Sequence, residues 1–293
     1  MNAPLASRLT RLQRLGSIAV SGADARTFLQ GQLSLDLDQL TPQRIEIASC
    51  SSPQGRVQAV LWIVERSDAI VLVLPASMVD TTITRLRKYV LRAKVKIESG
   101  AEQFAVYDAG ELPSGDAPRT HAQREVMSFI RWPGASPRTL VLAPSGTSDA
   151  TDLATDLARE HAWHLDDIRA GLPQVYPQTH ELFVAQMLNL DLLGGISFEK
   201  GCYTGQEIIA RMHFRGSVKR RMFRFRASCA APAPATRIVA DGTHAGDVVD
   251  AVATPEGCEL LAVIALTQID AALELDGVSG GRLAKMEMEY EVK

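Results

Sequence analysis

One stretch of ten residues, Phe-Glu-Lys-Gly-Cys-Tyr-Thr-Gly-Gln-Glu at 198–207, constrains the fold of this chain more than any other. Thr204 and Glu207 have the spacing of a capping box, in which each side chain accepts a hydrogen bond from the backbone amide of the other residue. The pattern therefore predicts a helix over residues 205–214, which a glycine then ends.

Cys202 lies two residues before the predicted cap and so near the positive end of the helix dipole. Lys200 adds a second positive charge two positions earlier, and both charges favour the thiolate form of a cysteine. Two interpretations stay open on these residues alone. Cys202 is either an activated thiol or, like most free cysteines, a small buried residue.

The totals indicate a globular protein of two or three packed units. The chain has 293 residues, of which 46% are hydrophobic and 22% charged, with a net charge of −3. No apolar run approaches the roughly 20 residues that a membrane-spanning helix needs. Four widely spaced cysteines and six scattered histidines show no metal-ligand spacing, so we expect neither a disulfide framework nor a resident metal.

The N-terminal segment has Arg8, Arg11 and Arg14 and no acid before Asp24, a composition typical of transit peptides. It runs directly into a predicted strand, so we interpret it as the start of the fold. We expect a cytoplasmic protein that acts as a monomer and does not bind membranes.

Residue patterns predict the elements in order. Strands are expected at 17–20, 44–49, 55–65, 69–74, 95–97, 126–132 and 139–142, helices at 24–33, 78–92, 151–163 and 182–193, and a surface loop at 109–123. Further strands at 245–249, 260–266 and 285–293, with glycine-rich turns between them, predict a small C-terminal β-barrel. The fold class is therefore α+β, divided into residues 1–215 and 216–293.

The motif Lys-Gly-Cys-Tyr-Thr-Gly-Gln-Glu resembles the signature of the YgfZ family, relatives of the glycine cleavage T-protein, an aminomethyltransferase. Further segments fit in the same order: Phe-Leu-Gln-Gly-Gln-Leu at 28–33, Ser-Pro-Gln-Gly-Arg at 52–56, Ile-Arg-Ala-Gly-Leu-Pro at 168–173, and residues 189–198. The resemblance spans nearly the whole chain. It implies a folate-binding fold of several subdomains, with tetrahydrofolate or another reduced folate as cofactor.

The resemblance also implies roles for particular residues. Cys202, tuned by Lys200, is expected to carry the chemistry as nucleophile, redox group or transient ligand. Trp163 matches a tryptophan that lines the folate pocket, where a flat indole suits a pterin or aminobenzoyl ring. The other residues expected at the folate site are Leu15, where some relatives have a second aromatic, Arg169, Gly171, Tyr203 and Gln206.

Two departures from the T-protein pattern affect the expected activity. Arg169 stands where a glutamate commonly accepts hydrogen bonds from the pterin, and an arginine cannot accept one. Either Asp166 or Asp167 takes over, or folate binds differently or weakly. Ala59 and Val60 stand where T-proteins have an acidic pair that positions tetrahydrofolate, which argues against aminomethyl transfer.

The resemblance implies a role in the assembly, repair or activity of iron–sulfur enzymes, including one that thiolates tRNA, with client or assembly proteins of such enzymes as partners. One alternative is a tetrahydrofolate-dependent one-carbon transferase. Another is a module that binds RNA or an acidic protein, because eight cations and no acid lie between 208 and 240. That basic run includes Arg211–Arg226, which we consider for tRNA; its other interpretation is a solvated strand face around Phe223 and Phe225.

Overall fold

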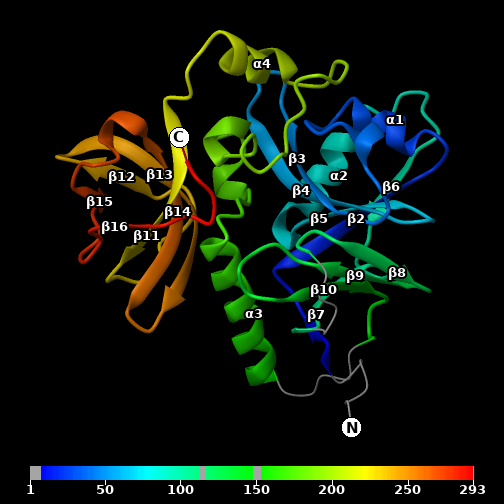
Figure 1. The fold of residues 1–293 in the computed structure, drawn as a ribbon, viewed down its shortest axis with the longest axis horizontal. Helices are drawn as coiled ribbons and strands as arrows, with labels where there is room; N and C mark the ends of the chain where they lie inside the picture. The colour runs from blue at the N-terminus through cyan, green and yellow to red at the C-terminus, as the bar shows by residue number, and fades with distance from the viewer. Residues whose placement is uncertain (1–7, 112–116, 148–152, 293) are drawn as a thin grey trace.

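The computed structural model describes residues 8–111, 117–147 and 153–292. Its strands form three sheets in which every pairing is antiparallel, and its helices lie outside the sheets (Figure 1). The α+β class predicted from the sequence is confirmed.

The first sheet holds the largest core. In spatial order its strands are β3 (Glu46–Ser51), β4 (Val57–Glu65), β5 (Ile70–Pro75), β2 (Leu15–Ser21) and β6 (Lys96–Ser99). Every residue of β5 is buried, as its unbroken Ile-Val-Leu-Val-Leu run requires of a strand covered on both faces. Helices α1 (Ala25–Gln30) and α2 (Val79–Arg87) accompany this sheet.

The second sheet packs against the first through one shared core, which includes Val106, Ile130, Leu140 and Leu142. Its strands are β1 (Thr10–Arg11), β7 (Ala105–Asp108), β10 (Thr139–Ala143), β9 (Met127–Arg131) and β8 (His121–Arg124). The predicted loop at 109–123 is wrong at its end, because His121 begins β8. Residues 112–116 of that loop lie outside the described part of the chain.

The third sheet contains the C-terminal strands and has a core of its own around Phe225, Ile238 and Leu260. Its strands are β15 (Leu273–Leu275), β12 (Arg237–Ala240), β13 (Thr243–Thr254), β14 (Gly257–Ala265), β11 (Arg220–Ala227) and β16 (Ala284–Met286). The sheet curves as half a barrel, and the closure predicted from the sequence is not shown. The predicted division after residue 215 falls between helix α4 (Gln206–Phe214) and β11 and stays a prediction.

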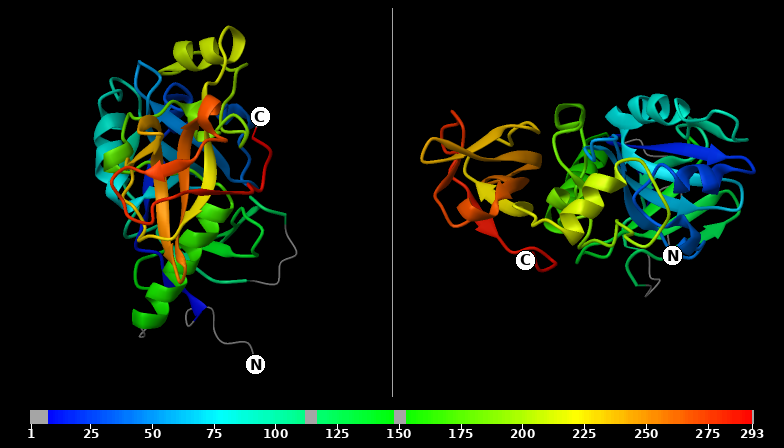
Figure 2. Two further views of the ribbon diagram at one scale, coloured as in Figure 1. Left: turned by 90° about the vertical axis from the view of Figure 1, so that its left-hand side faces the viewer. Right: turned by 90° about the horizontal axis from the view of Figure 1, so that it is seen from above.

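Helix α3 (Leu153–Arg169) lies between the C-terminal sheet and the other two (Figures 1 and 2). The sequence predicted its end at Trp163, but the helix continues for six residues more. Asp167 on its last turn accepts from Arg14, while Asp250 of β13 accepts from Tyr176 and bonds His164. These partly buried hydrogen bonds connect α3 to the N-terminal segment and to the C-terminal sheet.

Several predicted elements are shorter in the structure. Helix α2 ends at Arg87, since the chain beyond it leaves the core and Leu91 is 87% exposed. The predicted helix at 182–193 is only a 3₁₀ turn at Ala185–Leu188, which ends where Asn189 adopts φ +57°.

The predicted strand at 285–293 pairs only as far as Met286. The predicted alternation continues beyond it, because Met288 and Tyr290 are partly buried while Glu287, Glu289 and Glu291 are exposed. Met288 and Tyr290 pack on Gly171 rather than extending the sheet, which explains the early end of the ladder.

Candidate functional site

The 198–207 motif is anchored through Lys200, whose side chain points inward. Its ammonium donates to three backbone carbonyls at the end of α1 and just beyond it: Gln30 at 2.7 Å, Leu33 at 3.0 Å and Leu35 at 2.6 Å. Burial lowers the pKa of Lys200 to about 8. Two sequence segments that resemble the family are thus held together by one side chain.

A second anchor is the contact between Gly205 and the 52–56 turn. Gly205 has φ +86° and is the N-cap of helix α4 (Gln206–Phe214). A Cβ on Gly205 would lie 2.6 Å from the Ser52 carbonyl oxygen and 3.1 Å from the Cα of Gly55. Only a residue without a side chain fits this position.

The bounds predicted for this helix are nearly correct, but the predicted capping box is wrong. No side chain caps α4 in the described structure. The backbone amide of Thr204 instead donates to the Gly31 carbonyl. Packing against the turn therefore fixes where the helix begins.

Cys202 is exposed between these two anchors. Of the other cysteines, Cys50 and Cys258 are buried and Cys229 is partly exposed. Burial raises the pKa of the Cys50 thiol to about 11, and that of Cys258 also rises to about 11, through burial first and then its neighbour Cys229. The structure thus answers one question that the sequence left open, because Cys202 is not a core cysteine.

The other motif residues differ in their burial and contacts. Tyr203 is buried, its ring lies 5.1 Å from the Lys200 ammonium, and its hydroxyl has no hydrogen-bond partner among the described residues. Burial raises the pKa of Tyr203 to about 12. The Gln206 side chain donates to the Lys200 carbonyl at 3.4 Å. Glu207 is exposed on α4.

Trp163 lies in a row of three buried tryptophans. Its ring centroid is 5.9 Å from that of Trp132, which is 5.0 Å from that of Trp62. The guanidinium of Arg138 lies over the Trp163 ring at 4.6 Å. Trp163 is 3% exposed, so neither face of its ring is accessible to solvent.

Two polar atoms at this ring are buried without a partner in the described structure: Nε1 of Trp163 and Nε of Arg138. Arg138 could not be singled out from the sequence, because one arginine before a strand is a common pattern. Asp167, considered above as a pterin acceptor, already accepts from Arg138, Arg14 and the Trp132 indole.

The remaining predicted folate residues have structural partners. Leu15 is 2% exposed in the core of the first sheet. Gly171 has φ +66°, and a Cβ there would lie 2.6 Å from Met288 and 2.9 Å from Tyr290. Arg169 pairs with Glu259 of β14 at 2.7 Å, a partner far away in sequence that local reasoning could not find. Whether these residues contact folate stays a prediction.

Ala59 and Val60 lie within β4 with exposures of 2% and 0%. Neither side chain can ionise or accept a hydrogen bond from a nitrogen. The two positions at which the resemblance places the T-protein acidic pair therefore hold apolar side chains in the core.

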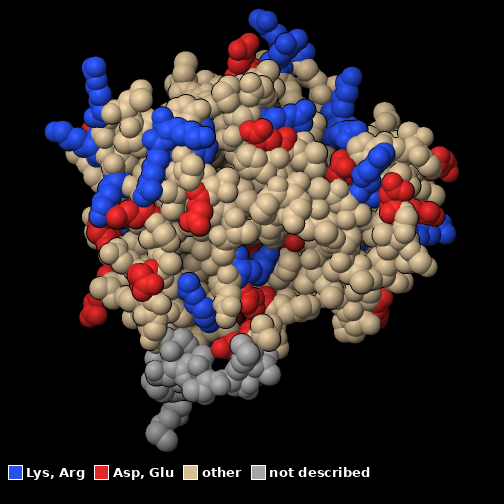
Figure 3. Space-filling model, turned by 180° about the vertical axis from the view of Figure 1, so that it is seen from behind, with Lys and Arg blue, Asp and Glu red and all other residues tan. Residues whose placement is uncertain are grey.

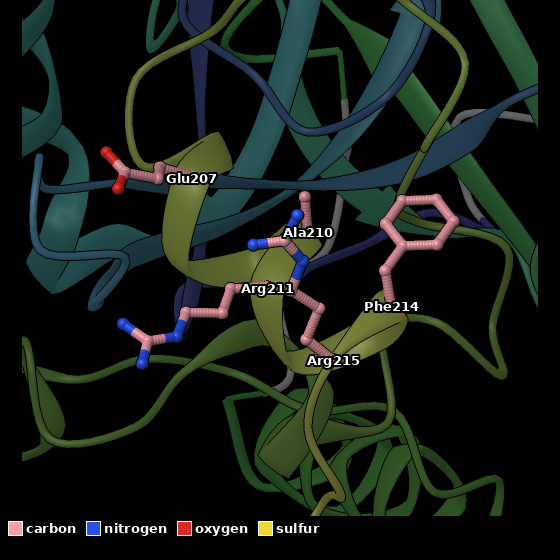
Figure 4. A pocket seen from close by; sticks show the side chains of 5 residues that line it. All are labelled: Glu207, Ala210, Arg211, Phe214 and Arg215. Atoms are coloured by element: carbon pink, nitrogen blue, oxygen red, sulfur yellow. The ribbon is translucent and has the colours of Figure 1, made fainter.

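The basic run does not form one surface. Arg221 is buried and forms a bidentate ion pair with Asp191, with N–O distances of 2.6 and 2.9 Å. The Arg224 guanidinium lies 3.4 Å from the Glu259 carboxylate. Arg211 on α4 and Arg215 directly after it are exposed. Together with Glu207, Ala210 and Phe214 they line a hollow of about 490 Å³ (Figure 4).

The described residues form neither a membrane-spanning helix nor a metal-binding cluster. Among the described helices, none is long and apolar enough to span a membrane. Within residues 8–111, 117–147 and 153–292, no group of three or more His, Cys, Asp or Glu side chains is placed to hold a metal ion.

Comparison with solved structures shows the fold. The glycine cleavage system aminomethyltransferase T from Bartonella henselae superposes with a TM-score of 0.72, over 94% of this chain and 83% of that one, at 14% sequence identity. The T-protein-like fold expected from the sequence is confirmed, and at this identity the likeness extends to the fold alone.

Comparison with curated proteins shows the family, although no family model matches the chain. The tRNA-modifying protein YgfZ of Edwardsiella ictaluri is 34% identical over 237 residues, 75% of this chain and 71% of the relative. That of Colwellia psychrerythraea is 30% identical over 227 residues, 73% of this chain and 70% of the relative. With the matching fold and the motif at 200–207, these similarities show that the chain belongs to the YgfZ family.

Proposed function

We propose that this protein acts in tRNA modification by supporting the assembly, repair or activity of iron–sulfur enzymes, including one that thiolates tRNA. The observation that carries the proposal is the exposed Cys202 between two rigid anchors, in a chain whose relatives are named tRNA-modifying proteins. Lys200 fixes the backbone before Cys202 and Gly205 fixes it after, so the thiol is presented at a defined place.

The chemistry proposed for Cys202 is that of one thiol acting on a partner's cluster. Iron–sulfur clusters usually take about four protein ligands. Cys50 and Cys258 are buried in different sheets, so they cannot join Cys202 around a cluster. Cys202 can supply one soft ligand, or one nucleophile, to a cluster that another protein holds. The cluster is thus substrate rather than resident cofactor.

Reduced folate is the second part of the proposal. Folate carries carbonyl and carboxylate acceptors, and the two unpartnered donors, Trp163 Nε1 and Arg138 Nε, fit such groups. Since Arg138 and Trp132 already pack on the indole, we assign Trp163 a hydrogen bond rather than a stacking contact. When bound, reduced folate would supply its capacity to carry one-carbon units.

The rival function, one-carbon transfer on the T-protein plan, lacks its positioning groups. Correct orientation of the reacting groups can lower an activation barrier by up to about 7 to 11 kcal/mol. Ala59 and Val60 offer no carboxylate for this purpose and lie buried in β4. We therefore propose that the protein does not convert an aminomethylated carrier and tetrahydrofolate into methylene-tetrahydrofolate.

A deletion strain tests the proposal. Loss of the gene is expected to lower tRNA methylthiolation and the activity of some iron–sulfur enzymes, while enzymes without clusters keep their activity. The matched control is the same strain with the gene restored. Equal losses in both enzyme classes, or unchanged methylthiolation, would contradict the proposed function.

A further inference from the structure

The outer face of α4 combines an exposed aromatic ring with exposed cations. Phe214 is 67% exposed, although large apolar side chains are usually buried. Arg211 and Arg215, three residues before it and one after it, line the same hollow, and all three side chains project from the helix (Figure 4). Figure 3 shows Lys and Arg side chains gathered toward the end of the molecule that carries α4 in Figure 1.

Phe214 packs against two other aromatic rings, those of Phe198 and His213. The His213 ring stacks on Phe198 with centroids 3.8 Å apart and an angle of 15° between the planes. Phe214 meets His213 edge to face at 4.7 Å. These contacts restrict the motion of Phe214 while leaving most of its surface open, which are the properties of a stacking platform.

We propose that this face of α4 binds unpaired nucleotides of RNA, with a base stacked on Phe214 and the adjacent phosphates on Arg211 and Arg215. The inference rests on the proposed function in tRNA modification and names the surface that would hold the RNA. Binding of single strands commonly combines base stacking on aromatics with cations along the backbone.

The charge distribution around α4 favours an anionic partner. No Asp or Glu occurs from 208 to 240, and Glu207 is the one acid that lines the hollow. Arg221 and Arg224, which belong to the same basic run, are paired with Asp191 and Glu259 and so are not available. The α4 cations are thus the exposed part of the run beside an aromatic ring.

The occupant that competes with RNA is an acidic peptide of a protein partner. An acidic peptide needs the two arginines but gains no stacking energy from a phenyl ring. Unpaired bases need both, because each has a flat face that stacks on an aromatic ring. The exposure of Phe214 between the two arginines therefore favours RNA.

The test measures binding of a fluorescein-labelled RNA hairpin with seven unpaired loop nucleotides, a blunt RNA duplex and an oligoglutamate peptide to the full-length protein. We expect the hairpin to bind more tightly than the duplex. Phe214→Leu, which keeps an apolar side chain, should weaken hairpin binding roughly 5- to 150-fold, the loss of one stacked base. Arg211→Gln with Arg215→Gln should lower the salt dependence by about 1.4 logarithmic units per tenfold change in salt.

The matched control is Arg226→Gln with Arg237→Gln, which removes two exposed cations of the same run from the C-terminal sheet. It should leave hairpin binding nearly unchanged. All substituted side chains are exposed, so each variant should keep its fold, which circular dichroism checks. The inference is overturned if hairpin and duplex bind equally, if Phe214→Leu binds the hairpin as the parent does, or if oligoglutamate binds more tightly than the hairpin.

A cell experiment separates this inference from the proposed function. If the protein binds no hairpin but its deletion still lowers methylthiolation, the inference is wrong and the proposed function stands. If Phe214→Leu loses hairpin binding but deletion leaves methylthiolation unchanged, the RNA site is supported and the proposed function is wrong.

Discussion

Gly205 and Gly55 touch through their backbones: a Cβ on Gly205 would lie 3.1 Å from the Cα of Gly55. Each has a positive φ, +86° and +70°, so both the conformation and the contact call for glycine. A Cβ on Gly55 would in turn lie 2.7 Å from Ile208 of α4. The turn at 52–56 and the 198–207 motif are therefore one unit, which places Cys202.

Gly205→Ala tests this contact through stability. The new methyl group would meet the Ser52 carbonyl at 2.6 Å, and the residue would keep a left-handed conformation. We expect the free energy of unfolding to fall by about 1 to 3 kcal/mol or more, as for other strained backbone positions. Urea denaturation at pH 7 measures the change.

The control is Gly242→Ala, because Gly242 has φ +73° but nothing within 4 Å of a built Cβ. It isolates the conformational penalty, about 1 kcal/mol or slightly more. Equal losses for the two variants would mean that the contact with the 52–56 turn does not matter.

Lys200 should make stability depend on pH. Its pKa in the folded protein is about 8, below its ordinary value of 10.5, because burial disfavours the charged form. The unfolded chain therefore binds more protons between these values, and the free energy of unfolding from this group rises as pH increases from about 8 to 10.5. Lys200→Met removes that rise.

The same variant should also be less stable at pH 7, since three carbonyls lose their donor at a cost of about 1 to 3 kcal/mol for each that stays buried. Lys94→Met is the control, because Lys94 is exposed. Urea denaturation from pH 7 to 10 compares the slopes. A parent slope equal to that of Lys200→Met would contradict the assignment.

Much of the fold could be predicted from local patterns. The apolar run at 70–75 and the hairpin around Gly55 have periods and turn residues that determine strands by themselves. The C-terminal end of α3 could not be predicted. Its stability depends on Asp167, whose partners Arg14 and Arg138 come from distant parts of the chain.

The thiols should react in an order set by exposure. Cys202 is exposed, Cys229 is partly exposed, and burial is the main cause that raises the pKa of Cys50 and Cys258 to about 11. The thiolate is the reactive form, so we expect iodoacetamide at pH 8 to modify Cys202 first and Cys50 and Cys258 last. Peptide mass spectrometry of a time course measures the order, with urea-unfolded protein as the reference. Native Cys50 or Cys258 reacting as fast as Cys202 would contradict it.

Folate binding should depend on the Trp163 indole nitrogen. Trp163→Phe keeps a ring but removes Nε1, and the loss of one hydrogen bond should weaken tetrahydrofolate binding by about 1 kcal/mol. Calorimetry suits this test better than fluorescence, because Trp62 and Trp132 lie in the same row of rings and would share any quenching.

Trp62→Phe is the control. Its Nε1 is also buried without a partner among the described residues, but its ring lies beyond Trp132 from Trp163. It should leave the affinity unchanged. If Trp163→Phe binds tetrahydrofolate as tightly as the parent does, the indole nitrogen does not contact folate and Trp163 only packs in the core.

The candidate site shows the limit of sequence reasoning more clearly than the fold does. The motif identified Cys202 and the helix after it, because both lie in one short segment. The hydrogen bonds from Lys200 to three backbone carbonyls and the Arg169–Glu259 pair join residues 90 or more positions apart. Such contacts appear only when the fold is known, so the sequence could not show that Lys200 donates to Gln30, Leu33 and Leu35. Whether Lys200 also tunes Cys202 stays a prediction.

The most direct test of the account is tRNA methylthiolation in a deletion strain that expresses Cys202→Ser, measured by mass spectrometry of digested tRNA at matched protein levels. Serine keeps the size and a hydroxyl but removes the soft thiolate, and Cys202 is exposed, so the fold should be unchanged. We predict that Cys202→Ser leaves methylthiolation at the level of the deletion strain, whereas Cys229→Ser restores it. Full restoration by Cys202→Ser would contradict the account.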